Sequence, residues 1–333
     1  MHTNPVIIHT PDAAQQTEVK SSSEGWVALM VMIVSGSTSV AFGKQLTEYF
    51  SPLSMLFLSE VMMLLFAVFS FGFIPLIKRI RRLDRTKLLP LVTAGVMTGV
   101  LAPLFRFWGL QHTSAVNTQL FGMTEMLFLI SFGTLYAHQK FQRVHGLGGL
   151  IIVAGMFLVA IKGFSDSVLF ALGDLGIITA GFFYAIGGTI ICAHLRSIAP
   201  QVIILIRSLC AISFFFVLSP FIPQPFITEM RHFPVELAAV LLSYGLISRF
   251  LVVFSYYSAI ERLPLPTISL LSTTSVAGAM GFAWLYLGET ITWYHIAGAG
   301  LIMTGASVVQ WTSIQQLEER FVHFIKTHHR QQM

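Results

Sequence analysis

The chain is dominated by long apolar runs that carry very few charged residues. The run MLFLSEVMMLLFAVFSF, at 55–71, contains a single charged residue, Glu60. A helix needs ~20 mostly apolar residues to cross the hydrocarbon core of a bilayer. Hydrophobic residues make up 55% of the chain and charged residues 11%, whereas soluble domains are about a quarter charged. A soluble fold could not bury this much apolar surface, so the sequence predicts an all-α integral membrane protein surrounded by the lipid bilayer.

Ten segments are apolar and long enough to be read as transmembrane helices, although the fifth is short. Short connections separate them, and several are closed by proline or glycine. The predicted spans cover 26–44, 52–77, 88–110, 115–137, 146–161, 175–193, 201–222, 235–260, 266–287 and 292–311.

Lysine and arginine are distributed unequally over alternate connections between these spans. Fourteen lie in the two tails and in the connections after spans two, four, six and eight, and six of these fall in the loop 78–87. The other connections hold only Lys44, Lys162 and Arg231. Because positive charge is retained on the cytoplasmic side, we expect a multi-pass protein of the cell membrane with both termini in the cytoplasm. The bacterial inner membrane is the expected location, and the basic loop indicates anionic lipid rather than nucleic acid.

The second half of the sequence repeats the first with an offset of 150 residues. LYAHQKFQRVHGLGGLIIVAGMFLV (135–159) aligns without a gap on LYLGETITWYHIAGAGLIMTGASVV (285–309). The same offset pairs Thr124 with Thr274. Five spans in each half mean that the second copy enters the membrane from the opposite side. The sequence therefore predicts two inverted five-helix repeats, a common architecture of secondary transporters.

This organisation divides the chain into two repeats with a linker and two tails. We expect a cytoplasmic disordered tail at 1–25, the first repeat at 26–161, a linker at 162–174, the second repeat at 175–311 and a cytoplasmic tail at 312–333.

Two pairs of glycines lie at matching positions of the repeats, Gly148 with Gly155 and Gly298 with Gly305. Within each pair the spacing of seven places both glycines on one helix face. Small residues let helix backbones approach closely in membranes, so we interpret these glycines as packing residues.

The ten spans and two halves are accompanied by two short motifs, LGET at 287–290 and AIERLPLP at 259–266. In these features the sequence resembles the EamA-type branch of the drug/metabolite transporter superfamily. It implies transport by a ten-helix fold and says little about the substrate. The family-motif positions are Lys44, Arg207, Gly288 and Glu289. The first half departs from the family pattern, with AHQKF at 137–141 where LGE is expected.

Five charged residues lie inside predicted spans: Glu60, Arg106, Glu125, Arg207 and Arg249. Each costs ~2.5–3.5 kcal/mol at a helix centre, so we expect them to face the bundle interior and to pair. Their depths along the spans predict the pairs Glu60–Arg106 and Glu125–Arg249, with Arg207 extending toward the cytoplasm. They can bind a substrate and carry a coupling proton, or they can form fixed structural salt bridges; both readings stay open.

Polar side chains in or near the spans are further candidate substrate contacts. Hydroxyls in spans more commonly bond their own helix, and tyrosines there are more commonly packing residues, so the alternative for each is structural. The candidates are Ser37, Asn117, Gln119, Tyr184, Tyr244 and Tyr256.

The function that these observations predict is secondary transport of a small polar organic metabolite, either an amino acid-like zwitterion or an organic anion. Alternating access is the expected mechanism, protons are a candidate coupling partner, and a homodimer is a candidate assembly. We expect no enzyme, catalytic residue, metal or cofactor, because the chain has no HExxH or GxSxG motif. The cysteines, Cys192 and Cys210, lie in apolar segments without CxxC spacing. The alternative function is a non-transporting multi-pass membrane sensor or scaffold.

Overall fold

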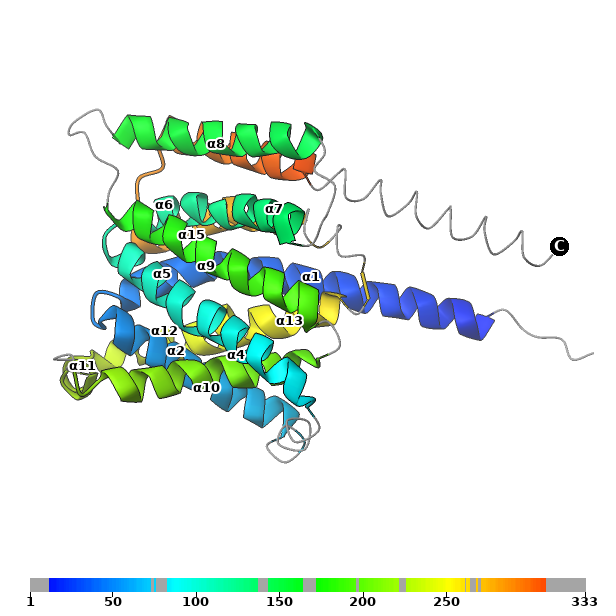
Figure 1. Ribbon diagram of the computed structural model, residues 1–333. Helices are drawn as coiled ribbons and strands as arrows, with labels where there is room; N and C mark the ends of the chain where they lie inside the picture. The colour runs from blue at the N-terminus through cyan, green and yellow to red at the C-terminus, as the bar shows by residue number, and fades with distance from the viewer. Residues whose placement is uncertain are drawn as a thin grey trace, which may run out of the picture.

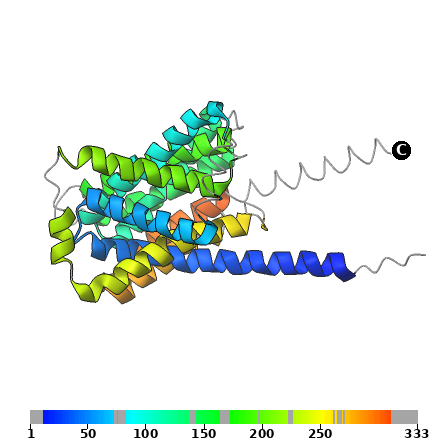
Figure 2. The same ribbon diagram turned by 90° about the horizontal axis from the view of Figure 1, so that it is seen from below.

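A computed structural model describes residues 12–72, 75, 83–136, 143–163, 172–195, 198–221, 226–260, 262–263, 268 and 271–309. Within these residues every regular element is helical, and the helices pack side by side as one bundle (Figures 1 and 2). The predictions for residues 1–11, for the first half of the basic loop at 78–87, for most of the linker and for the C-terminal tail lie outside the described residues.

Seven helical segments are long and apolar enough to cross a membrane, and they coincide with predicted spans one to three and five to eight. Two shorter apolar helices, Ser275–Leu287 and Trp293–Val309, occupy predicted spans nine and ten. The seven are Ser23–Leu46, Pro52–Phe71, Arg85–Gln111, Arg143–Ile161, Leu172–Ile191, Gln201–Leu218 and Val235–Tyr256.

Several of these segments are built from more than one element. The elements of the first half are α1 (Asp12–Leu46), α2 (Pro52–Phe71), η1 (Arg85–Lys87), α4 (Leu88–Val96), η2 (Met97–Leu101), α5 (Ala102–Gln111), α6 (Ala115–Gly122), α7 (Thr124–Tyr136) and α8 (Arg143–Gly163). Those of the second half are α9 (Leu172–His194), α10 (Pro200–Leu218), α11 (Phe226–His232), η3 (Val235–Leu237), α12 (Ala238–Ser243), η4 (Tyr244–Leu251), α13 (Val252–Ile260) and α15 (Ser275–Leu287). The last helix, Trp293–Val309, follows α15.

Two helices begin earlier than the sequence predicts. Helix α1 begins at Asp12, inside the segment that the sequence analysis treats as a disordered tail. No glycine or proline interrupts 12–24, so the helix continues out of the apolar region. The fifth span, predicted to be short, belongs to a helix of 21 residues that begins at Arg143.

Predicted spans four and nine are interrupted at the same place in the repeat. One residue separates α6 from α7, and a turn at 273–274 precedes α15. The Thr124 hydroxyl donates to the Phe121 carbonyl at 2.8 Å, and the Thr274 hydroxyl donates to the Leu271 carbonyl at 2.6 Å. The two breaks are thus stabilised by the same local hydrogen bond, 150 residues apart.

The segments that form predicted spans three and eight also share an irregularity. Both contain π-helix, at Met97–Leu101 and at Tyr244–Leu251. With the offset of 150 residues, Met97–Leu101 corresponds to 247–251, which lies within the second π-helical segment. Single π-helical turns are frequent at functional sites because they change the direction of the side chains that follow. The repeat seen in the sequence therefore recurs in local backbone geometry.

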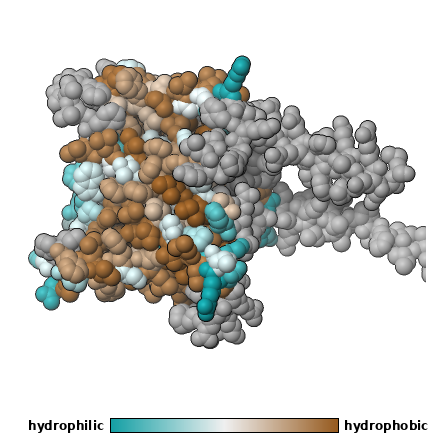
Figure 3. All heavy atoms as spheres, viewed as in Figure 1, coloured by the Kyte–Doolittle hydropathy of each residue, from teal (hydrophilic) through white to brown (hydrophobic). Residues whose placement is uncertain are grey.

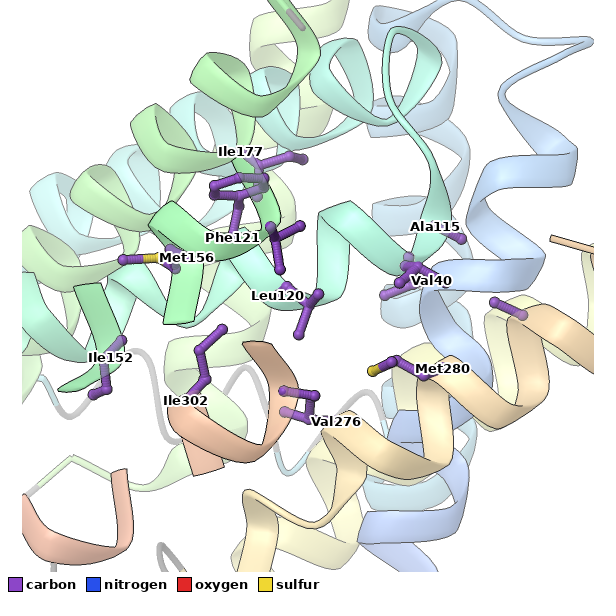
Figure 4. Packing of buried hydrophobic residues seen from close by; sticks show 14 of the residues in the cluster. Val40, Ala115, Leu120, Phe121, Ile152, Met156, Ile177, Val276, Met280 and Ile302 are labelled. Atoms are coloured by element: carbon purple, nitrogen blue, oxygen red, sulfur yellow. The ribbon is translucent and has the colours of Figure 1, made fainter. Parts of the chain in front are cut away.

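A buried apolar cluster joins elements of both halves (Figure 4). Val40 of α1, Leu120 and Phe121 of α6, and Val276 and Met280 of α15 belong to it, and each is at most 5% exposed. Helix α1 thus packs against α15 of the other half as well as against its own half. This contact fixes the two halves against each other in the arrangement that the structure shows.

Large apolar side chains also cover the outside of the bundle (Figure 3). Phe69 is 91% exposed, Leu65 62% and Phe216 62%. Contiguous apolar surface of this kind is rare on soluble monomers, and it fits a bundle surrounded by lipid.

Helix α8 and the last helix cross through the four glycines, at one edge of the bundle in Figure 1. A Cβ atom at Gly305 would lie 2.6 Å from the Gly148 carbonyl oxygen, and one at Gly155 would lie 2.8 Å from the Gly298 carbonyl oxygen. The interpretation of these glycines as packing residues is confirmed.

We expect the Gly305→Val substitution to destabilise this crossing by about 1–3 kcal/mol, because added volume would meet backbone that cannot rotate away. Gly300→Val on the same helix is the matched control, since a Cβ atom there would have nothing within 4 Å. Thermal unfolding of the two detergent-purified variants measures the difference. Equal midpoints for the two variants would contradict the packing role.

Candidate functional site

A carboxylate held by three side chains lies inside the bundle. Glu60 of α2 is 0% exposed. Its Oε1 atom accepts hydrogen bonds from Arg207 Nη2 at 2.6 Å and from Arg249 Nη2 at 2.5 Å. Its Oε2 atom accepts one from the Ser208 hydroxyl at 2.8 Å. We call these four residues the charged hub; Glu60 comes from the first half of the chain and the other three come from the second.

The hub corrects both predicted pairs of charges. Arg106 was the predicted partner of Glu60 and Glu125 that of Arg249, and both predictions are wrong. Arg207 forms an ion pair with Glu60 instead of extending toward an interface. The position of a residue along a span predicts the depth of its side chain in the membrane, but not the direction in which the side chain points from the helix axis. Pairing depends on that direction.

The two arginines of the hub keep donors that no described residue uses. Within the described residues Arg207 and Arg249 each donate one hydrogen bond, both to the same oxygen. Their Nε atoms are buried without a hydrogen-bond partner in this part of the chain. An arginine has five N–H donors in a planar fork that matches carboxylate and phosphate. The hub is therefore held together and still has donors available for a ligand.

Glycine in the π-helix η2 allows Arg207 to take this position. A Cβ atom at Gly99 would lie 2.5 Å from Arg207 Cγ and 2.8 Å from the Arg207 carbonyl oxygen. Only a residue without a side chain lets η2 approach α10 this closely. The first half thus contributes the backbone against which Arg207 packs as well as the carboxylate that it binds.

A second set of polar residues lies next to the hub. Tyr244, which is 4% exposed, interacts electrostatically with Arg249, Arg106 and Tyr184. Glu125 is half-buried and experiences the charge of Arg106. We call these four residues, Arg106, Glu125, Tyr184 and Tyr244, the flanking set.

Helix α9 brings the flanking set together. A Cβ atom at Gly181 would lie 3.0 Å from the Glu125 backbone nitrogen, so α7 crosses α9 in direct contact at this glycine. Two residues further along, Phe183 stacks on Phe105 of α5 with ring centroids 5.6 Å apart. Helix α9, which carries Tyr184, therefore packs against both the helix that carries Glu125 and the helix that carries Arg106.

Six of the ten predicted substrate or coupling candidates gather in the hub and the flanking set: Glu60, Arg106, Glu125, Tyr184, Tyr244 and Arg249.

Ser37 and Tyr256 lie in other surroundings. The Ser37 hydroxyl donates to the Ile33 carbonyl of its own helix at 2.8 Å and contacts α15, which is the structural alternative considered from the sequence. Tyr256 is 38% exposed on α13.

Asn117 and Gln119 are half-buried on α6. The Asn117 Oδ1 atom is buried and accepts no hydrogen bond from the described residues.

Two of the family-motif residues hold the loop between α5 and α6. Lys44 Nζ donates to the carbonyls of Leu110 and Thr113, both at 2.7 Å. The Glu289 carboxylate accepts from the backbone N–H groups of Ala115 at 2.6 Å and Val116 at 2.9 Å. A cation at the C-terminal end of α5 and an anion at the N-terminal end of α6 both complement the helix dipoles.

We call this arrangement the loop clamp, consisting of Lys44, Glu289 and the loop 110–116. Gly288 precedes Glu289 with a φ of +68° and ends α15 in a left-handed turn, which glycine adopts without strain. The LGET motif thus supplies a glycine that ends one helix and a carboxylate that caps another. From the sequence these residues are predicted only as family positions and their role is not, although a lysine after an apolar span and a glutamate after a helix-ending glycine are capping signals.

The loop clamp is tied to further elements. Gln111 Nε2 donates to the carbonyls of Thr47 at 2.9 Å and Phe50 at 3.0 Å. The Thr113 hydroxyl donates to Asp174 at the start of α9 at 2.6 Å. One short loop therefore connects the ends of α1, α5, α6, α9 and α15.

No group of three or more histidine, cysteine, aspartate or glutamate side chains that could hold a metal ion is found among the described residues.

The apolar surface and the long apolar helices define a multi-pass membrane protein. The family model of the EamA-like transporter family matches residues 23–161 and 171–311. The chain belongs to this family, and each half of it matches the family model once.

Two curated relatives and one solved structure are similar to parts or most of the chain. An uncharacterized transporter of Methanothermobacter thermautotrophicus is 30% identical over 108 residues, and the match spans only 32% of each protein. A probable 4-amino-4-deoxy-L-arabinose-phosphoundecaprenol flippase subunit ArnF of Erwinia tasmaniensis is 35% identical over 92 residues, 27% of this chain and 70% of the relative. A solved structure titled "Crystal structure of protein" superposes with a TM-score of 0.61 at 15% identity, over 90% of this chain and 99% of that one. That likeness concerns the fold alone.

Proposed function

We propose that the protein is a secondary transporter that moves a small polar organic metabolite, either a zwitterion or an organic anion, by alternating access. The observation that carries the proposal is the charged hub, in which a buried carboxylate of the first half holds two arginines of the second half. Buried ionisable groups in membrane helices are costly and mark substrate or ion pathways. Placement between the two halves is where transporters built from repeats bind their substrates.

The proposed architecture has ten spans in two inverted repeats, 26–161 and 175–311, with both termini in the cytoplasm of a bacterial cell. Its support is the pair of matching helix breaks, at 123 and at 273–274, and the pair of matching π-helical segments. Interrupted helices at corresponding positions of the two halves are typical of transporter binding sites.

We propose Glu125 as the residue that carries a coupling proton. Glu60 is held by two arginines, whereas Glu125 forms no hydrogen bond or ion pair within the described residues. A carboxylate that is not fixed in an ion pair can bind and release a proton during a transport cycle. In proteoliposomes, Glu125→Gln is expected to remove the dependence of substrate uptake on a pH gradient. Uptake that still follows the gradient would exclude this role.

Accessibility from both sides of the membrane tests alternating access without a known substrate. We expect the Tyr184→Cys variant, with Cys192 and Cys210 replaced by alanine, to react with a membrane-impermeant maleimide in right-side-out and in inside-out vesicles. Trp293→Cys, at the exposed start of the last helix, is the control and should react from one side only. Labelling of Tyr184→Cys from a single side would contradict alternating access and favour the sensor or scaffold alternative.

A further inference from the structure

The charges of the hub and the flanking set do not balance, even with Glu125 ionised. Three arginines, Arg106, Arg207 and Arg249, stand against two carboxylates, Glu60 and Glu125. One positive charge is in excess in surroundings of low dielectric constant, where an uncompensated charge is costly. A ligand with one negative charge would neutralise the set, whereas a zwitterion would leave the excess unchanged and a cation would increase it.

Arg106 is the arginine of this set for which no described residue is a direct partner. Arg207 and Arg249 both bind Glu60 directly. Within the described part of the chain Arg106 forms no hydrogen bond or ion pair, and it acts on Glu125 and Tyr244 only through its charge. Its guanidinium group therefore keeps its whole donor fork available for an acid group.

The surroundings of Arg106 suit the rest of an organic anion. Phe105, one residue before Arg106 on α5, stacks on Phe183, one residue before Tyr184 on α9, so the two helices carry aromatic rings at the level of Arg106. The hydroxyls of Tyr184 and Tyr244 form no hydrogen bond with the described residues, so both are available to a polar ligand. Aromatic surface with a few free polar groups is the usual composition of a small-molecule site.

We infer that the ligand of this site is a small organic anion with one net negative charge, and that Arg106 binds its acid group. This inference rests on the proposed transport function and narrows its substrate class. In it the charged hub has a different role: Glu60 is a built-in counter-ion that keeps Arg207 and Arg249 in place when no ligand is bound. Glu125 faces the same arginine as the ligand, so its negative charge opposes anion binding and its protonation would favour it.

Four probes that share one aromatic ring and differ in charge test the inference on the purified full-length protein. Phenylacetate is the anion, phenylacetamide the neutral probe, 2-phenylethylammonium the cation and phenylalanine the zwitterion. We expect phenylacetate to raise the thermal midpoint and to bind most tightly by isothermal titration calorimetry. Tighter binding of any of the other three, or no stabilisation of the wild-type protein by phenylacetate, would overturn the inference.

Two variants and a control locate the site. Arg106→Gln should weaken phenylacetate binding about tenfold or more, the scale of a lost charge-assisted hydrogen bond, whereas Arg85→Gln, on an exposed arginine of η1, should not change it. Glu125→Gln should tighten phenylacetate binding, because it removes a repelling charge; this test holds even if Arg106→Gln fails to fold. Unchanged binding in Arg106→Gln, or unchanged or weaker binding in Glu125→Gln, would contradict the inference. Preference for phenylalanine would overturn the charge argument and leave the proposed transport function standing.

Discussion

Replacing Glu60 with glutamine should destabilise the folded protein by about 3–5 kcal/mol, which is the cost of removing one partner from a buried ion pair. The amide keeps the shape of the carboxylate but removes the negative charge that pairs with Arg207 and Arg249. Thermal unfolding in detergent, together with denaturant titration, measures the loss. Glu236→Gln, at an exposed glutamate, controls for the chemical change and should have almost no effect.

The hub also predicts an asymmetry between its members. Arg249→Gln should be milder than Glu60→Gln, because Glu60 then keeps Arg207 and Ser208 as partners and the charges of the hub balance. The double variant Glu60→Gln/Arg249→Gln should recover part of the stability lost in Glu60→Gln, as double-mutant cycles show for interacting charges. If the two effects simply add, or if Arg249→Gln is the more damaging single change, the account of the hub is wrong.

Replacing Lys44 with methionine should destabilise the protein by about 2 kcal/mol or more, since hydrogen bonds to charged groups contribute about 1.5–3 kcal/mol each. The substitution keeps the apolar stem of the lysine and removes two short bonds, to the carbonyls of Leu110 and Thr113. Hydrogen exchange should locate the effect, with faster exchange of the amides at 111–116 than in the wild-type protein. Arg231→Met, at an exposed cation of α11, is the matched control.

The loop clamp predicts that Lys44 and Glu289 act on the same loop. Glu289→Gln should also speed exchange at 111–116, because it weakens the cap on Ala115 and Val116. Residues that share a structural element are expected to be non-additive, so the double variant should lose less stability than the two single losses combined. Strict additivity, or faster exchange elsewhere than in this loop, would show that the clamp is not one unit.

The apolar runs made most of the fold predictable from the sequence. A stretch such as 52–71 has one low-cost conformation in lipid, because a helix satisfies its own backbone hydrogen bonds. The sequence did not show that predicted span four would divide into α6 and α7. The hydrogen bond from Thr124 to the Phe121 carbonyl that closes this break is local, but a threonine in a helix makes a similar bond without breaking it.

The site was predictable in its members and not in its contacts. Buried charges are expensive wherever they point, so Glu60, Arg106 and Arg249 could be singled out from the sequence alone. Which arginine meets which carboxylate depends on helix rotation, and Arg249 lies within the π-helix Tyr244–Leu251, which alters that rotation. A regular helical period could not have predicted this direction.

Uptake by proteoliposomes tests the central claim, that the chain is a transporter, most directly. Vesicles containing purified protein would be incubated with a mixed pool of carboxylates, amino acids, sugars and nucleosides, with a pH gradient in either direction, and their lumen analysed by mass spectrometry. The account predicts that at least one small polar metabolite, a monoanion first of all, accumulates above the level in protein-free vesicles, and that Arg106→Gln vesicles lose this accumulation. A lumen indistinguishable from that of protein-free vesicles under both gradients would contradict the account.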